Sequence, residues 1–123
     1  MKELLNIGRN KLKKNGNILI FTLETSKNEI PTFLSMERKL KTSLIRDKKI
    51  IAFLSKLYPK NKKRKFSFKV TISKNKYVEM IKNKYISILL NLNKDQILKG
   101  INEIKCKYPK ILKFNDKLIC LIL

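Results

Sequence analysis

Three polar side chains at the end of an apolar segment are the first candidates for chemistry in this 123-residue sequence. Thr22, Glu24 and Thr25 lie at or just beyond the end of residues 17–23, whose run of apolar side chains predicts a buried strand. In open α/β sheets, ligands bind in the crevice beyond the carboxyl ends of the strands. Glu24 could orient a bound molecule there. The alternative is a solvated carboxylate after a strand, which we favour because no other part of a site accompanies it.

A further candidate is Tyr85, in the second half of the sequence. The pattern of residues 74–92 predicts a helix in which Tyr85 shares one side with Ile81 and Ile88. At that spacing an aromatic side chain is more often part of the core, and the alternative is that Tyr85 closes a substrate pocket.

The histidine and cysteine content of the sequence gives little support for a metal site or a catalytic thiol. The sequence has no histidine, and Cys106 and Cys120 lie far apart without a second cysteine at metal-binding spacing. Cys120 lies in an apolar run and is predicted to be a small core residue, whereas Cys106 is expected to be a free thiol. We therefore expect no metal and a reducing, intracellular, cytoplasmic setting. No signal peptide or membrane span of about 20 apolar residues is recognisable.

The net charge of +21, from 30 basic and nine acidic residues, allows two interpretations. It predicts attraction to phosphate polymers or anionic membranes. However, only four of the basic residues are arginines, and a Lys/Asn/Ile bias is typical of proteins from AT-rich genomes, so the charge can equally be a solvated surface. The densest basic run, residues 60–65, is predicted to be an exposed loop.

The order of the predicted elements indicates a single α/β domain over residues 1–123. Residues 66–72 alternate between apolar and polar, which predicts an edge strand with Phe66 and Phe68 on its buried face. For this reason we do not interpret them as exposed aromatics that stack on RNA bases. The first half is predicted to form a helix at 2–14 with a left-handed stop at Asn15-Gly16, a strand at 17–23, a loop at 24–32 and a helix at 33–57 that is broken once at most. After the strand at 66–72, we expect a helix capped by Ser73 and another that is opened by Asn93 and Gln96 and stopped by Pro109. The last element is predicted to be a hairpin of strands 111–114 and 118–123 around Asn115-Asp116.

Two stretches resemble one enzyme family. Leu12-Lys13-Lys14-Asn15-Gly16, followed by an apolar strand, is similar to the turn before the fifth strand of class I S-adenosylmethionine-dependent methyltransferases, with Asn15 where proline or glycine is usual. Residues 46–123 follow the order of segments in the C-terminal part of a subset of those enzymes. The resemblance covers nearly the whole chain, but only the back half of the family's domain.

The resemblance implies part of a Rossmann-like methyltransferase fold, with a three-stranded mixed sheet in the family's strand order 5-7-6 and helices packed on it. Residues 17–23 would be strand five, 66–72 strand six and 117–123 strand seven, which runs antiparallel between the other two. The outer edge of 17–23 would then be open.

The family's cofactor, S-adenosylmethionine, is bound by a glycine-rich turn after the first strand and an acidic residue after the second. Gly8, Gly16 and Gly100 are the only glycines here, and none has that spacing or lies between a strand and a helix. No cofactor is therefore expected for this chain alone, and no residue is assigned to one.

These observations lead to a methyltransferase-like fragment, inactive alone, as the first hypothesis. In methyl transfer the protein supplies positioning and, where needed, a base, and Thr22, Glu24, Thr25 and Tyr85 would be on the substrate side. The expected partner is a chain that supplies the missing cofactor-binding half, or a second copy that pairs through 17–23. The alternatives are a small basic RNA- or ribosome-associated protein, which binds nucleic acid without sequence specificity, and an interaction subunit of a split methyltransferase.

Overall fold

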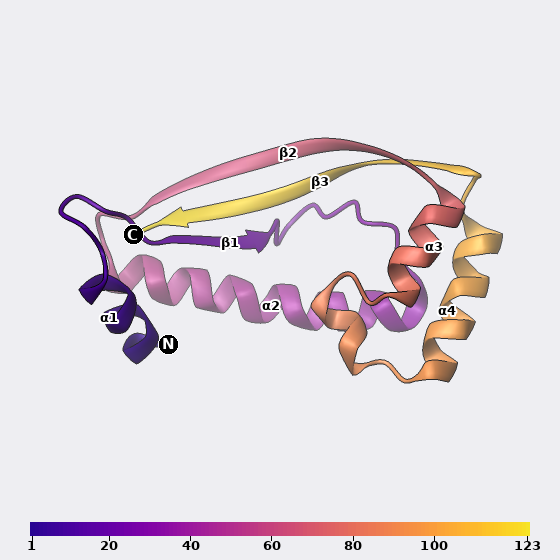
Figure 1. The fold of residues 1–123 in the computed structure, drawn as a ribbon, viewed down its shortest axis with the longest axis horizontal. Helices are drawn as coiled ribbons and strands as arrows, with labels where there is room; N and C mark the ends of the chain where they lie inside the picture. Colours follow the sequence, from indigo (N-terminus) through magenta and orange to yellow (C-terminus); the bar gives the residue numbers. More distant parts are fainter.

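The computed structural model describes all 123 residues as four α-helices, one short 3₁₀ helix and three strands (Figure 1). The order along the chain is α1 (Lys2–Asn10), β1 (Leu19–Leu23), α2 (Leu34–Leu57), β2 (Lys62–Ser73), α3 (Lys74–Lys82), the 3₁₀ helix η1 (Ser87–Asn91), α4 (Lys94–Lys107) and β3 (Ile111–Ile122). In Figure 1, α2 runs along the length of the sheet, α1 lies at one end and α3 and α4 lie together at the other.

The sheet has the strand order β1-β3-β2, which is the order that the sequence predicts. Both outer strands pair antiparallel with β3, from Leu19 opposite Ile122 on one side to Ser73 opposite Ile111 on the other. The prediction of a mixed sheet is therefore wrong. The two outer strands run parallel to each other, but β3 separates them, so no parallel pair is hydrogen-bonded.

The predicted hairpin in the last segment is also wrong, because β3 is one continuous strand. Asn115 and Asp116 lie within it, opposite Lys69 and Phe68 of β2. Neither residue has a positive φ angle, which a tight two-residue hairpin turn requires. The extra length of β2 explains the difference, since twelve residues of β2 pair with β3 without a break.

The basic segment predicted to be a loop forms the first part of β2, which begins at Lys62. Phe66 and Phe68 are 41% and 53% exposed, which contradicts the prediction that they are core residues. Val70 and Ile72, on the same face of β2, are partly buried, and Ile72 packs against the main core. Because long paired strands twist strongly, one face of this ribbon is covered at the Ile72 end and exposed at the Phe66 end.

Helix boundaries follow the capping signals closely. Ser73 Oγ accepts a hydrogen bond from the Lys76 amide at 3.2 Å. Asn93 and Gln96 form a reciprocal capping box, with bonds of 2.8 and 3.0 Å. α2 has no break, and α4 ends two residues before Pro109.

Two helix ends come earlier than the periodicity predicts. α1 ends at Asn10 rather than residue 14, although Asn15 does adopt the predicted left-handed conformation with φ 67°. α3 ends at Lys82, and Lys84 has φ 50°, so Tyr85 lies outside the helix. The left-handed residue interrupts the i to i−4 hydrogen bonds at the end of α3, whereas α1 ends at Asn10, before the left-handed Asn15 is reached.

The buried side chains form two cores, one at each end of the sheet. The larger has 13 buried members, of which Phe33 and Leu92 flank helices and the others come from the first half of α2, α3, η1, α4 and β3, including Met36, Tyr77 and Ile104. The smaller consists of Leu5 of α1, Leu54 of α2 and Leu121 of β3, with Ile20 of β1 packed against it. The cysteines are free, Cys106 exposed and Cys120 buried, as predicted.

Candidate functional site

Glu24 is the one charged residue that the fold buries, at 7% exposure. It follows β1 directly, and its amide donates to the Lys117 carbonyl of β3 at 2.8 Å. The Ser26 hydroxyl donates to Glu24 Oε1 at 2.9 Å, and Lys65 Nζ of β2 lies 3.5 Å from Oε2. A carboxylate from β1 and an ammonium from β2 therefore meet at the end of the shortest strand.

Burial by itself raises the pKa of Glu24, but the Ser26 hydrogen bond and the Lys65 charge outweigh it, so the pKa lies below its ordinary value. A carboxylate of this kind stays ionised at neutral pH and is a weak proton acceptor. It suits the orientation of a bound hydroxyl or amine group better than the removal of a proton.

Two adjoining cavities open beside Glu24. One, of about 400 Å³, is lined by Glu24, Lys63 and Lys65 together with Ile51 and Ala52 of α2. The other, of about 480 Å³, lies between the loop after β1 and α2 and does not include Glu24 among its lining residues. Thr25, Ser26 and Lys48 line both cavities, so the loop after β1 has open space on two sides. The first cavity brings several ammonium groups to one carboxylate, which suits a polar or anionic molecule.

The structure brings Glu24 and Thr25 together and leaves the other two candidates apart. Thr22 donates its hydroxyl to the neighbouring Leu23 carbonyl at 3.2 Å. The Tyr85 hydroxyl lies 3.1 Å from that of buried Tyr77, which itself donates to the Pro31 carbonyl. Burial raises the pKa of Tyr85, and the nearby Asp116 raises it further. The side chain of Tyr85 is 39% exposed and contacts the main core through Tyr77, so Tyr85 is not a buried residue of a helix. It does not line the Glu24 cavity either.

Sequence reasoning missed Ser26 and Lys65, the two partners of Glu24. Ser26 is two residues along the chain and resembles any loop serine. The sequence predicts Lys65 to lie in a loop, but β2 begins at Lys62, so Lys65 is opposite Ile119, which is itself opposite Thr22. A longer predicted strand with this register would have placed Lys65 near Glu24.

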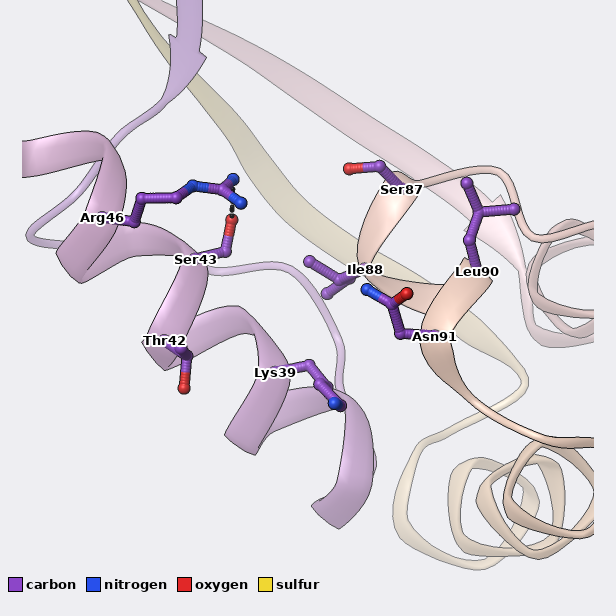
Figure 2. A pocket seen from close by; sticks show the side chains of 8 residues that line it. All are labelled: Lys39, Thr42, Ser43, Arg46, Ser87, Ile88, Leu90 and Asn91. Atoms are coloured by element: carbon purple, nitrogen blue, oxygen red, sulfur yellow. Dashed lines mark hydrogen bonds between the residues drawn. The ribbon is translucent and has the colours of Figure 1, made fainter. Parts of the chain in front are cut away.

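A third cavity, of about 440 Å³, lies between α2 and η1 (Figure 2). Lys39 and Arg46 project from α2, and Ser87 and Asn91 lie on the facing η1. Arg46 is already bound by the Ser43 hydroxyl at 3.1 Å and by Asp47 at 3.3 Å. The cavity has no carboxylate, thiol or imidazole among its lining residues, so its hydroxyl groups have no acidic or histidine partner there that could activate them as nucleophiles.

The glycines do not fit a site for S-adenosylmethionine. Gly8 lies inside α1, Gly100 lies inside α4 with its Cα hydrogens directed at the Phe33 ring, and Gly16 is in the turn after α1. None of them follows a strand and precedes a helix, where the family's turn brings the backbone to the cofactor. This chain's own residues therefore do not build that cofactor site.

Comparison with protein-family models, with curated proteins and with solved structures finds no match to this chain. None of the helices combines the length and the apolar character needed to cross a membrane. The described residues also contain no group of three or more histidine, cysteine or acidic side chains that could hold a metal ion.

The lowered pKa of Glu24 predicts a loss of stability in acid. Because the pKa is lower in the folded than in the unfolded chain, the stabilisation is present above the ordinary carboxyl pKa of about 4.3 and is lost as pH falls through the folded value. We expect urea denaturation to show that the free energy of unfolding falls less for Glu24→Gln than for the wild type between pH 6 and pH 3, about the range that spans this titration. Lys65→Gln should reduce the loss in the same direction. Identical pH profiles for all three proteins would contradict the pairing.

Proposed function

We propose that this chain is the substrate-side half of a class I methyltransferase domain, and that it acts together with a polypeptide segment that carries the glycine-rich cofactor site. The observation that carries the proposal is the sheet order β1-β3-β2, with the last strand inserted antiparallel between two strands that are parallel to each other. This is the arrangement that the resemblance implies for strands five, seven and six.

The outer edge of β1 supports the need for such a segment. Ile18 and Leu123 exchange backbone hydrogen bonds of 3.3 and 2.9 Å, and the Glu24 amide bonds to Lys117, so the even-numbered residues of β1 face β3. Leu19, Phe21 and Leu23 therefore direct their amides and carbonyls away from β3, where no strand pairs with them. Such an edge is a template for another strand.

Glu24 and Thr25 then take the substrate-side role. They lie beyond the carboxyl end of β1, beside the 400 Å³ cavity, where open sheets bind ligands. Glu24, ionised and fixed by Ser26 and Lys65, orients the hydroxyl or amine that accepts the methyl group. Its contribution is positioning, since its pKa is lowered and it is a weak base.

The test uses proline at the free edge of β1. Leu19→Pro removes an outward amide and leaves the Ile18 and Ile20 bonds to β3 intact, so the chain should fold normally. Co-expression with a polypeptide that carries strands one to four of a class I methyltransferase should give a 1:1 complex by light scattering. We expect Leu19→Pro to weaken that complex about 10-fold or more, the effect of one lost edge hydrogen bond and strand misfit.

Leu19→Ala is the matched control, because it loses the same side chain and keeps the amide. It should weaken the complex less than Leu19→Pro. If no complex forms with the wild type, or if the proline and alanine variants bind equally well, strand addition at β1 is wrong.

A further inference from the structure

An exposed aromatic face lies on the sheet, apart from the Glu24 cavities. We define the aromatic face as Leu19 and Phe21 of β1 with Phe66 and Phe68 of β2. Their side chains are 54%, 57%, 41% and 53% exposed. They are on the side of the sheet opposite Ile20 and Leu121, which pack with α1 and α2. This face is therefore open where the other face is covered.

The rings of the aromatic face form a continuous surface across three strands. The Phe21 and Phe66 centroids are 6.3 Å apart at 42°, and the Phe66 and Phe68 centroids are 6.4 Å apart with planes within 6° of parallel. Between them, β3 contributes Cys120 opposite Phe21 and Leu118 opposite Phe66. Cys120 is 3% exposed although it belongs to neither core, so the neighbouring side chains cover it and complete the surface.

Positive charge adjoins the aromatic face at the start of β2. Lys62 and Arg64 lie on the same face of β2 as Phe66, because residues two apart in a strand share a face. Lys63, on the opposite face of β2, lines the Glu24 cavity instead, and neither Lys62 nor Arg64 has an ion-pair partner. β2 thus carries two unpaired cations, Lys62 and Arg64, at its start and two exposed rings, Phe66 and Phe68, in its middle.

We propose that the aromatic face binds single-stranded nucleic acid, with unpaired bases stacked on Phe21, Phe66 and Phe68 and phosphates bound by Lys62 and Arg64 of β2. Proteins that bind single strands combine a basic track with aromatic side chains on which successive bases stack. The bases of a duplex are already stacked on each other, so a duplex cannot use the rings. This inference is independent of the methyltransferase proposal, since strand addition uses the edge of β1 and base stacking uses its face.

The choice of nucleic acid over an acidic protein segment rests on the rings. An apolar protein surface needs only apolar area, which leucine supplies as well as phenylalanine. A base needs a flat π-face, which leucine lacks. The sequence predicts Phe66 and Phe68 to be core residues, which argued against base stacking here. The exposure of both rings removes that objection, and Phe21 adds a ring from a second strand.

The test measures fluorescence anisotropy of a labelled polyuridine RNA, about 12 nucleotides long to span the face, against the full chain. We expect Phe68→Leu to weaken binding about 10-fold, which corresponds to the loss of one stacked base, and Phe68→Tyr to bind like the wild type. Phe53→Leu is the matched control, because Phe53 is 45% exposed but lies on α2. It should leave the affinity unchanged.

Arg64→Gln should weaken binding and reduce the dependence of log affinity on log salt by about one unit, whereas Arg38→Gln on α2 should change neither. If Phe68→Leu binds the RNA as the wild type does, or if a duplex of equal charge binds equally well, the site is wrong and the binding is only polyelectrolyte attraction. Sedimentation offers a second check. If the chain forms a dimer that persists in Phe68→Leu and dissociates in Phe68→Ala, the nucleic-acid proposal is wrong, because a second copy of the chain then occupies the aromatic face.

Discussion

Leu54→Ala is expected to lower the free energy of unfolding by about 2–5 kcal/mol, the usual range for a buried leucine in a core that cannot collapse. Leu54 is fully buried and packs with Leu5 of α1 and Leu121 of β3, which are the other two buried residues of the smaller core. Since α1 has few other buried contacts, its amides should exchange with solvent hydrogen faster in the variant than in the wild type.

The measurement is urea denaturation, with hydrogen exchange read separately for α1 and α4. Leu57→Ala is the control on the same helix, because Leu57 is 38% exposed, and it should cost less than about 1 kcal/mol. Exchange in α4, which belongs to the other core, should change less than in α1. Equal losses for Leu54→Ala and Leu57→Ala would contradict the placement of α1 and α2 against the sheet.

Gly100→Ala is expected to destabilise the chain by about 1–3 kcal/mol, although alanine is the better helix former. A Cβ at residue 100 would overlap the ring of Phe33, at its Cγ, Cδ2 and Cε2 atoms. Phe33 is 2% exposed and packs among the 13 buried residues of the main core, so the ring has no free space to enter. The overlap therefore outweighs the gain of about 1 kcal/mol in helix propensity.

Gly8→Ala separates the two effects. Residue 8 also lies in a helix, but a Cβ there would meet Ile18 Cδ1 at 3.5 Å, an ordinary contact. This variant should gain about 0.5–1 kcal/mol. Thermal denaturation of both variants tests the pair, and a stabilised Gly100→Ala would show that α4 does not pack on Phe33 as described.

Local signals in the sequence predicted the helix ends where a side chain makes the cap. Ser73 and the Asn93–Gln96 pair bond the amides they were expected to bond, because capping depends on neighbours within four residues. The strand order was also predicted, from the burial of the terminal segment and the resemblance. The position of β1 at the sheet edge follows from the same order, but the prediction of a buried strand at residues 17–23 is wrong, since Leu19 and Phe21 are 54% and 57% exposed and no residue of β1 is buried.

The errors came from properties that no short window contains. The Asn115-Asp116 pair has turn chemistry, but the pairing of twelve residues in β2 and β3 overrides it. The alternation of apolar and polar residues correctly predicted a strand at residues 66–72. However, the twist of the β2-β3 ribbon exposes Phe66 and Phe68 and covers Ile72, although all three lie on the same face of β2. At the candidate site, Glu24 was identified and judged to be solvated. Its burial depends on Lys65, which comes from a strand 41 positions later in the chain.

The most direct test of the proposed function is a calorimetric titration with S-adenosylmethionine. The chain alone should give no saturable heat, because its glycines do not build the cofactor turn. Its purified complex with a polypeptide that carries strands one to four should bind the cofactor in a 1:1 ratio, and more tightly than that polypeptide does alone. Saturable binding by the 123-residue chain alone, or a complex whose affinity equals that of the added half, would contradict the account.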